Sequence, residues 1–179
     1  KGSSGDKLDG LDFLYQRYTA DDAAYTGRVT VPLLWDKQQQ RIVSNESSEI
    51  IRMFNSAFDG LTGDRLDFYP EPLQQQIDRL NDRIYPAVNN GVYRAGFATS
   101  QGAYEQAFDG LFAELDWLEV LLGEKRYLAG EYLTEADVRL FTTLARFDAV
   151  YYSHFKCNLR RIADYPNLSN WLRELYQWP

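Results

Sequence analysis

The residues with the clearest potential for chemistry lie between Val31 and Ser47. Pro32 interrupts an apolar stretch that otherwise predicts a β-strand, and a central strand rarely tolerates proline because the missing N–H breaks the ladder. A cis bond between Val31 and Pro32 would leave the backbone groups of Val31 free to pair with an extended peptide. Glu46 and Ser47 open the helix that follows, and its first N–H groups can bind a carboxylate. The pattern therefore predicts a site for a short peptide that carries a carboxylate.

Several motifs resemble a known family. TVP at residues 30–32 and NESSEIIRM at 45–53 resemble the glutathione-binding half of glutathione transferases, which have a thioredoxin-like fold. NNGVYRAGFATSQGAYEQAF at 89–108 and FDAVYYSHFKCNLRRI at 147–162 resemble one subgroup, the glutathionyl-hydroquinone reductases or xi class. Because the resemblance covers nearly the whole chain through separate motifs, it is far more specific than a single glycine motif.

The resemblance implies an α+β fold class. Residues 1–62 would be the C-terminal half of a thioredoxin-like, glutathione-binding domain, and residues 63–179 an all-α glutathione-transferase C-terminal domain. It also implies glutathione as co-substrate, a glutathionyl-hydroquinone or related aromatic substrate, no metal, and a homodimer.

Glutathione presents an ammonium, two carboxylates and a central thiol. Glu46 can pair with the ammonium, and Ser47 can hold the γ-glutamyl carboxylate at the helix end. Residues 28–31 match the family's RVTV motif and comprise Arg28, Val29, Thr30 and Val31. The backbone of this stretch would pair with the cysteinyl residue of glutathione. Alternatively, Glu46 only complements the helix dipole and Ser47 only caps the helix. The proline just ahead of them favours binding.

Two of the thirteen tyrosines are singled out by the resemblance rather than by spacing. Tyr93 matches the tyrosine that the family places over the substrate as proton donor or acceptor. Tyr151 matches a tyrosine near the catalytic thiol, where a phenol O–H can lower the thiol pKa. Tyr152 is adjacent, and the sequence alone does not separate the two. A tyrosine stripe is otherwise usually core or interface.

The single cysteine, Cys157, lies three residues after the single histidine, His154, on what the sequence predicts to be one helix. This spacing invites a catalytic or metal-binding reading, but no third ligand is evident and buried inert cysteines are common. We reject it. The family's nucleophile is a cysteine at the start of the first thioredoxin helix. Too few residues precede Val29 for a βαβ unit of ~30 or more residues, and residue 1 is not methionine, so we expect that part of the protein to precede this chain.

The elements that must position these residues follow from hydrophobic periodicity and turn residues. Residues 11–18 predict a short helix, and Val29–Trp35 with Arg41–Ser44 an antiparallel strand pair. Asn45 is expected to cap the next helix, and residues 59–72 to form a linker. Beyond it we expect helices at 73–90, bent or ended by Pro86 and stopped by Gly91, at 103–122, after an N-cap at Thr134, and around 168–175.

Composition narrows the function classes. With 179 residues and a net charge of −7, the chain can bury a core but would repel a nucleic-acid backbone. No run of ~18 apolar residues predicts a membrane span. One cysteine fits a reducing compartment, and we expect the cytoplasm. Two alternatives stay open: an omega-like glutathione thioltransferase, and a non-catalytic transferase-like module that docks partners.

Overall fold

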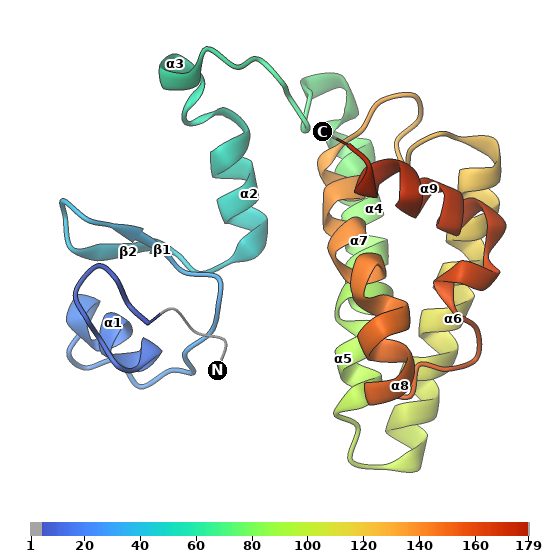
Figure 1. Cartoon of the computed structure of the whole chain (residues 1–179), viewed down its shortest axis with the longest axis horizontal. Coiled ribbons are helices and arrows are strands. Elements are labelled where there is room, and N and C mark those ends of the chain that lie inside the picture. The colour runs from blue at the N-terminus through green and yellow to red at the C-terminus, as the bar shows by residue number, and fades with distance from the viewer. Residues whose placement is uncertain (1–4, 179) are drawn as a thin grey trace. The chain divides into compact units, whose positions relative to one another are not determined.

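A computed structural model describes residues 5–178. The first four residues, with which the expected first domain begins, and Pro179 lie outside the described part. The chain divides into two compact units, Lys1–Arg65 and Leu66–Pro179 (Figure 1). Both this division and the expected boundary between residues 62 and 63 fall in the segment that follows helix α3.

The first unit combines a two-stranded sheet with three helices. Strands β1 and β2 form an antiparallel hairpin in which Trp35 lies opposite Ile42. Helices α1 and α2 both contact β2. The elements are α1 (Leu14–Asp21), β1 (Leu34–Asp36), β2 (Arg41–Ser44), α2 (Ser47–Ser56) and α3 (Asp59–Thr62).

The first strand is shorter than the sequence predicts. The prediction ran from Val29 to Trp35, but β1 begins only at Leu34. Pro32 has no N–H to give to a ladder, so regular pairing starts beyond it. The expected cis bond between Val31 and Pro32 is confirmed.

The prediction that Asn45 caps helix α2 is wrong. The N-cap is Glu46, and its side chain makes no capping hydrogen bond. The Asn45 side chain instead donates to the hydroxyl groups of Tyr18 and Thr30, each over 3.2 Å. The expected linker at 59–72 contains a short helix, α3. This helix ends at Gly63, whose φ of 72° is the left-handed conformation that glycine favours.

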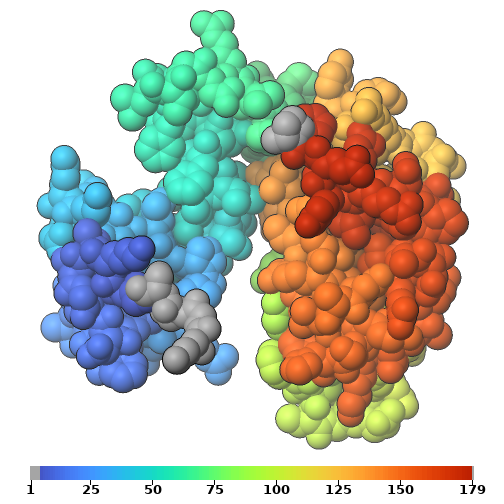
Figure 2. All heavy atoms as spheres, in the orientation of Figure 1, coloured from blue at the N-terminus to red at the C-terminus, as the bar shows by residue number. Residues whose placement is uncertain are grey.

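The second unit is a helical bundle in which α6 packs against α5 and α9, and α7 against α4 and α9 (Figure 1). Figure 2 shows one face of this unit, coloured green to red, with all its heavy atoms as spheres. Its elements are η1 (Glu71–Leu73), α4 (Gln74–Ile84), η2 (Tyr85–Asn89), α5 (Gly91–Gly96), α6 (Gln101–Glu124), α7 (Glu135–Arg146), η3 (Phe147–Tyr151), α8 (Tyr152–His154), η4 (Ile162–Asp164) and α9 (Pro166–Tyr176). Among the described residues, no helix combines the length and the apolar character needed to cross a membrane.

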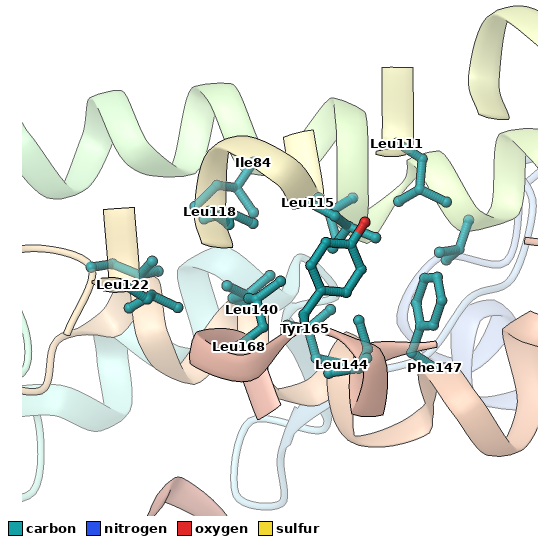
Figure 3. Packing of buried hydrophobic residues seen from close by; sticks show 14 of the residues in the cluster. Ile84, Leu111, Leu115, Leu118, Leu122, Leu140, Leu144, Phe147, Tyr165 and Leu168 are labelled. Carbon is teal, nitrogen blue, oxygen red and sulfur yellow. The ribbon is translucent and has the colours of Figure 1, made fainter. Parts of the chain in front are cut away.

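Helix α6 supplies the central stripe of the core. Leu111, Leu115 and Leu118 are fully buried, as the three- and four-residue spacing predicts. Figure 3 shows this stripe packed with side chains from the neighbouring elements. They include Ile84 on α4, Leu140 and Leu144 on α7, Phe147 on η3 and Leu168 on α9. Ala103, which the sequence placed at the start of the stripe, is exposed, because the first turn of α6 lies beyond the core.

The α-helix that carries this stretch, α4, ends at Ile84, two residues before Pro86, which agrees with the prediction that Pro86 bends or ends it. The chain continues as the π-helix η2, in which the N–H of Asn90 donates to the carbonyl of Tyr85 over 2.8 Å. A wider turn accommodates a residue that cannot donate to the α-helical ladder. The prediction that Gly91 stops the helix is wrong, because Gly91 begins α5.

The expected capping box at the start of α7 is confirmed, and it extends into a buried network. Asp137 accepts hydrogen bonds from the N–H and hydroxyl of Thr134, both over 3.0 Å. It also accepts from the N–H of Leu128 over 2.9 Å and from Nε1 of Trp171 over 3.1 Å. Burial raises the pKa of this carboxyl, against the four hydrogen bonds that lower it. Asp137 thus joins α7 to the preceding loop and to α9.

Candidate functional site

The segment Arg28–Val31 is held by tyrosine hydroxyl groups rather than by a neighbouring strand. The hydroxyl of Tyr18 donates to the carbonyl of Thr30 over 2.8 Å and accepts from its N–H over 3.3 Å. The hydroxyl of Tyr25 donates to the carbonyl of Arg28 over 2.8 Å. These bonds fix an extended segment outside the hairpin, so that its backbone is not consumed by sheet pairing.

Val31, the last residue of this segment, is open to a ligand. Its relative exposure is 75%, and no hydrogen bond joins its N–H or C=O to any residue that the structure describes. An extended peptide laid alongside could pair with both groups, as in the addition of a β-strand.

The start of α2 offers a second set of free donors. Glu46 and Ser47 are exposed, and within residues 5–178 nothing accepts from the N–H groups of Ser47 and Ser48. The N–H of Glu46 is held by Ser44 Oγ over 3.0 Å, and this hydroxyl donates to Glu49 over 2.8 Å. The helix end is therefore fixed in place, and its unpaired N–H groups are suited to a carboxylate.

Tyr18 and Asn45 connect these two parts, and sequence reasoning did not single out either of them for this role. Tyr18 is buried, and its hydroxyl bonds both Thr30, next to Val31, and Asn45, next to Glu46. Burial raises the pKa of Tyr18, but the hydrogen bonds from Thr30 and Asn45 outweigh it and the net pKa is lowered. The hydrophobic periodicity of the sequence cannot predict this link. It becomes visible only in the structure, where Tyr18 on α1 bonds Thr30 and Asn45 in two separate loops.

In the second unit, the structure brings Tyr93 and Tyr151 together. Tyr93 lies on α5 and Tyr151 at the end of η3, and their hydroxyl oxygens are 3.0 Å apart. Tyr151 is 2% exposed, whereas Tyr93 is 37% exposed. Tyr152 is not part of this pair; its ring lies 5.0 Å from the guanidinium carbon of Arg161.

The two tyrosines of the pair differ in their environment. Burial, and then the hydrogen bond with Tyr93, raise the pKa of Tyr151 to about 12. Tyr151 therefore keeps its proton near neutral pH and is suited to donate a hydrogen bond, while Tyr93 is the more exposed residue of the pair.

An aromatic surface surrounds Tyr93. Its ring lies 6.2 Å from that of Phe97 and 5.5 Å from that of Phe155, and Phe97 is largely exposed. Gly96 permits this arrangement, because a Cβ there would lie 2.2 Å from Cγ of Phe155. Sequence reasoning missed Phe97 and Phe155, although both lie inside the motifs that carry the family resemblance. Such rings can bind an aromatic ligand by stacking.

A cavity of about 410 Å³ lies beside this aromatic surface. Gly96, Tyr104 and Phe155 form part of its wall, together with His154 and Lys156. Tyr104 fixes one side, since its hydroxyl donates to the carbonyl of Lys156 over 2.7 Å.

Cys157 is not placed for catalysis. The expected single helix through His154 and Cys157 is wrong, because α8 ends at His154. The thiol is completely buried, and burial raises its pKa to about 12, so the reactive thiolate is scarce near neutral pH. In the described part of the chain, no three His, Cys, Asp or Glu side chains gather as metal ligands.

Comparisons with known proteins show which proteins the chain resembles. Residues 101–174 match the model of the glutathione S-transferase C-terminal domain. The chain is 61% identical over 170 residues to the glutathionyl-hydroquinone reductase PcpF of Sphingobium chlorophenolicum, covering 95% of this chain and 54% of that protein. It is 59% identical over 178 residues to the glutathionyl-hydroquinone reductase YqjG of Escherichia coli, covering 99% of this chain and 54% of that protein.

Solved structures of related proteins show the same similarity. The glutathione-bound structure of E. coli YqjG superposes with a TM-score of 0.97 at 59% identity, over 99% of this chain and 58% of that one. A xi-class transferase from Natrialba magadii gives a TM-score of 0.95 at 47% identity, over 99% of this chain and 54% of that one. The chain spans about half the length of the curated relatives it matches. Over nearly its whole length, this chain is similar to glutathionyl-hydroquinone reductases and to xi-class glutathione transferases.

Proposed function

We propose that this chain belongs to an enzyme that uses glutathione to reduce glutathionyl-hydroquinones to hydroquinones. The observation that carries the proposal is the pair of phenolic hydroxyl groups, Tyr93 and Tyr151, 3.0 Å apart within an aromatic surface. Aromatic rings can hold the substrate ring, and a phenol can exchange a proton with the substrate's own phenolic oxygen. The relatives named above support this activity.

The reaction has two halves. In the first, a cysteine thiolate attacks the sulfur of the glutathionyl group while the substrate ring is in its keto form. The carbon–sulfur bond breaks, its electron pair passes into the ring as the enolate of the hydroquinone, and a protein–glutathione mixed disulfide forms. In the second, a glutathione thiolate attacks this disulfide, releases the cysteine thiolate and leaves as oxidised glutathione. Cys157, buried and protonated, is not that nucleophile.

The residues of the first unit are proposed to hold glutathione. The Val31 backbone pairs with the cysteinyl residue, Glu46 pairs with the ammonium, and the Ser47 hydroxyl and N–H bind the γ-glutamyl carboxylate. Arg28, Val29 and Thr30 complete the extended segment. The exposed backbone of Val31 and the free N–H groups of α2 support this assignment.

The same proposal covers the organisation of the protein. Residues 1–62 bind glutathione, residues 63–179 bind the aromatic substrate, and the protein acts as a homodimer in the cytoplasm without a metal. Light scattering coupled to gel filtration of the full-length protein measures its mass in solution, and a monomer at working concentration would contradict the dimer.

Ser47→Ala in the full-length protein is expected to weaken glutathione binding by about 1–3 kcal/mol, because a hydrogen bond to a charged group is lost. Isothermal titration calorimetry measures the change. Ser56→Ala, at the exposed other end of the same helix, is the matched control and is expected to bind as the parent does. Equal affinities for all three proteins would mean that Ser47 only caps the helix.

Cys157→Ser in the full-length protein is expected to keep most of the reductase rate, because a buried, protonated thiol takes no part in thiolate chemistry. A chain limited to residues 1–179 is expected to lack thiol-dependent turnover for the same reason. Steady-state assays with a glutathionyl-hydroquinone test both statements. Turnover by residues 1–179 alone would show that Cys157 is the nucleophile.

A further inference from the structure

We propose that Arg146 is a positioning residue which, through Tyr151, stabilises negative charge on the hydroxyl oxygen of Tyr93. This inference rests on the proposed role of Tyr93 in proton exchange. It concerns the electrostatics of the tyrosine pair, which can be measured without turnover.

The pair has a preferred direction. A phenolate is better solvated at Tyr93, which is 37% exposed, than at Tyr151, which is 2% exposed. When Tyr93 has given its proton to a substrate, Tyr151 can donate its own O–H across the 3.0 Å between the two oxygens. A hydrogen bond to the charged form favours that form.

Arg146 places a positive charge beside this pair. Its guanidinium carbon lies 5.7 Å from the centroid of the Tyr151 ring, within the range of a cation–π contact. Its Nε donates to the carbonyl of Thr142 over 2.7 Å, so the side chain is anchored along the last turn of α7. No carboxylate among residues 5–178 forms an ion pair with Arg146, and its charge is therefore not neutralised locally.

The other groups that face Tyr151 do not supply a competing charge. They are Tyr93 on α5 and Cys157 on the segment after α8, a thiol that burial keeps protonated because its pKa is raised to about 12. The uncharged rings of Phe147 and Phe155 also lie against the ring of Tyr151. Arg146 lowers the pKa of Tyr151 against the larger effect of burial, and in the proposal its charge also acts on the Tyr93 oxygen that is hydrogen-bonded to Tyr151.

The test is a titration of Tyr93 by NMR in the full-length protein containing isotope-labelled tyrosine, with the signal assigned by its loss in Tyr93→Phe. Arg146→Met keeps the length of the side chain and removes its charge. We expect it to raise the titration midpoint of Tyr93 by about 0.5–1 pH unit, less than the 1–3 units of a direct contact because Arg146 is exposed. Arg146→Lys is expected to restore part of the shift.

The matched control is Arg161→Met. The guanidinium carbon of Arg161 lies 5.0 Å over the ring of Tyr152, the neighbouring tyrosine, instead of over the ring of Tyr151. It is expected to leave the Tyr93 midpoint unchanged. In a Tyr151→Phe background, Arg146→Met is expected to shift the Tyr93 midpoint less. The Tyr151 hydroxyl, through which Arg146 is proposed to act on Tyr93, is already missing there.

An unchanged midpoint in Arg146→Met, or an equal shift in Arg161→Met, would overturn the assignment of Arg146. An undiminished shift in the Tyr151→Phe background would overturn the route through Tyr151. These results are independent of turnover. Full activity of Tyr93→Phe would instead refute the proposed role of Tyr93 in proton exchange while leaving the titration result intact.

Discussion

Tyr93→Phe in the full-length enzyme is expected to slow the deglutathionylation of a hydroquinone by at least ~10-fold. General acid–base participation is typically worth 10²–10⁴-fold in rate, and the lower bound allows for water taking the place of the phenol. Removal of glutathione from an aromatic carbon passes through a keto form of the ring, so a proton must move at the ring oxygen. Tyr93 presents its hydroxyl at the exposed side of the tyrosine pair, where such an oxygen can reach it.

The same variant is expected to leave exchange with a simple mixed disulfide nearly intact. In that reaction one thiolate attacks and another leaves, and no phenolic proton is transferred. Steady-state rates on the two substrates, measured side by side, separate a hydroquinone reductase from a general thioltransferase. Tyr132→Phe, at an exposed tyrosine ahead of α7, serves as the control for loss of a hydroxyl group. Equal losses on both substrates would defeat the catalytic assignment of Tyr93.

Asp137→Ala is expected to lower the free energy of unfolding of the second unit by roughly 3–5 kcal/mol. The substitution leaves buried hydrogen-bond donors without an acceptor, and each such donor costs about 1–3 kcal/mol. The donors are the N–H groups of Leu128 and Thr134 and Nε1 of Trp171. Loss of the desolvation cost of the carboxylate offsets part of the effect. Urea unfolding followed by tryptophan fluorescence and circular dichroism measures the change.

Asp137→Asn provides a graded comparison. Its amide oxygen can keep the bonds from Leu128 and Trp171, and its NH₂ can donate to the Thr134 hydroxyl, so that only the Thr134 N–H loses its partner. We expect a loss of about 1–2 kcal/mol. Asp109→Ala, at an exposed position of α6, is expected to change stability by less than about 0.5 kcal/mol. A destabilisation by Asp137→Ala no larger than that of Asp109→Ala would show that the network contributes little.

The sequence predicted the helical unit better than the sheet-containing one. The stripe of Leu111, Leu115 and Leu118 repeats over many turns, and the Thr134–Asp137 box is a local signal. The predicted strand began too early at Val29: Pro32 marks where regular pairing can start, and the apolar residues before it are held by the hydroxyls of Tyr18 and Tyr25 instead.

The candidate site shows the same contrast. Spacing identified the free helix start at Glu46 and Ser47, because an anion-binding helix end is a local feature. Tyr93 and Tyr151 are 58 residues apart, and only the family resemblance singled them out. Nothing local predicts that two π-helical segments, η2 and η3, would interrupt the helices near them, since the wider turn depends on packing in the folded unit.

The Tyr18 hydroxyl has a consequence for the thermodynamics of binding. It donates to Thr30 and accepts from Thr30 and Asn45, so one atom fixes the residue before Val31 and the residue before Glu46. A ligand that contacts both Val31 and Glu46 binds to backbone that was already ordered when the chain folded. Less conformational entropy is therefore lost on binding. The affinity of this site is therefore governed partly by a residue that a ligand need never touch.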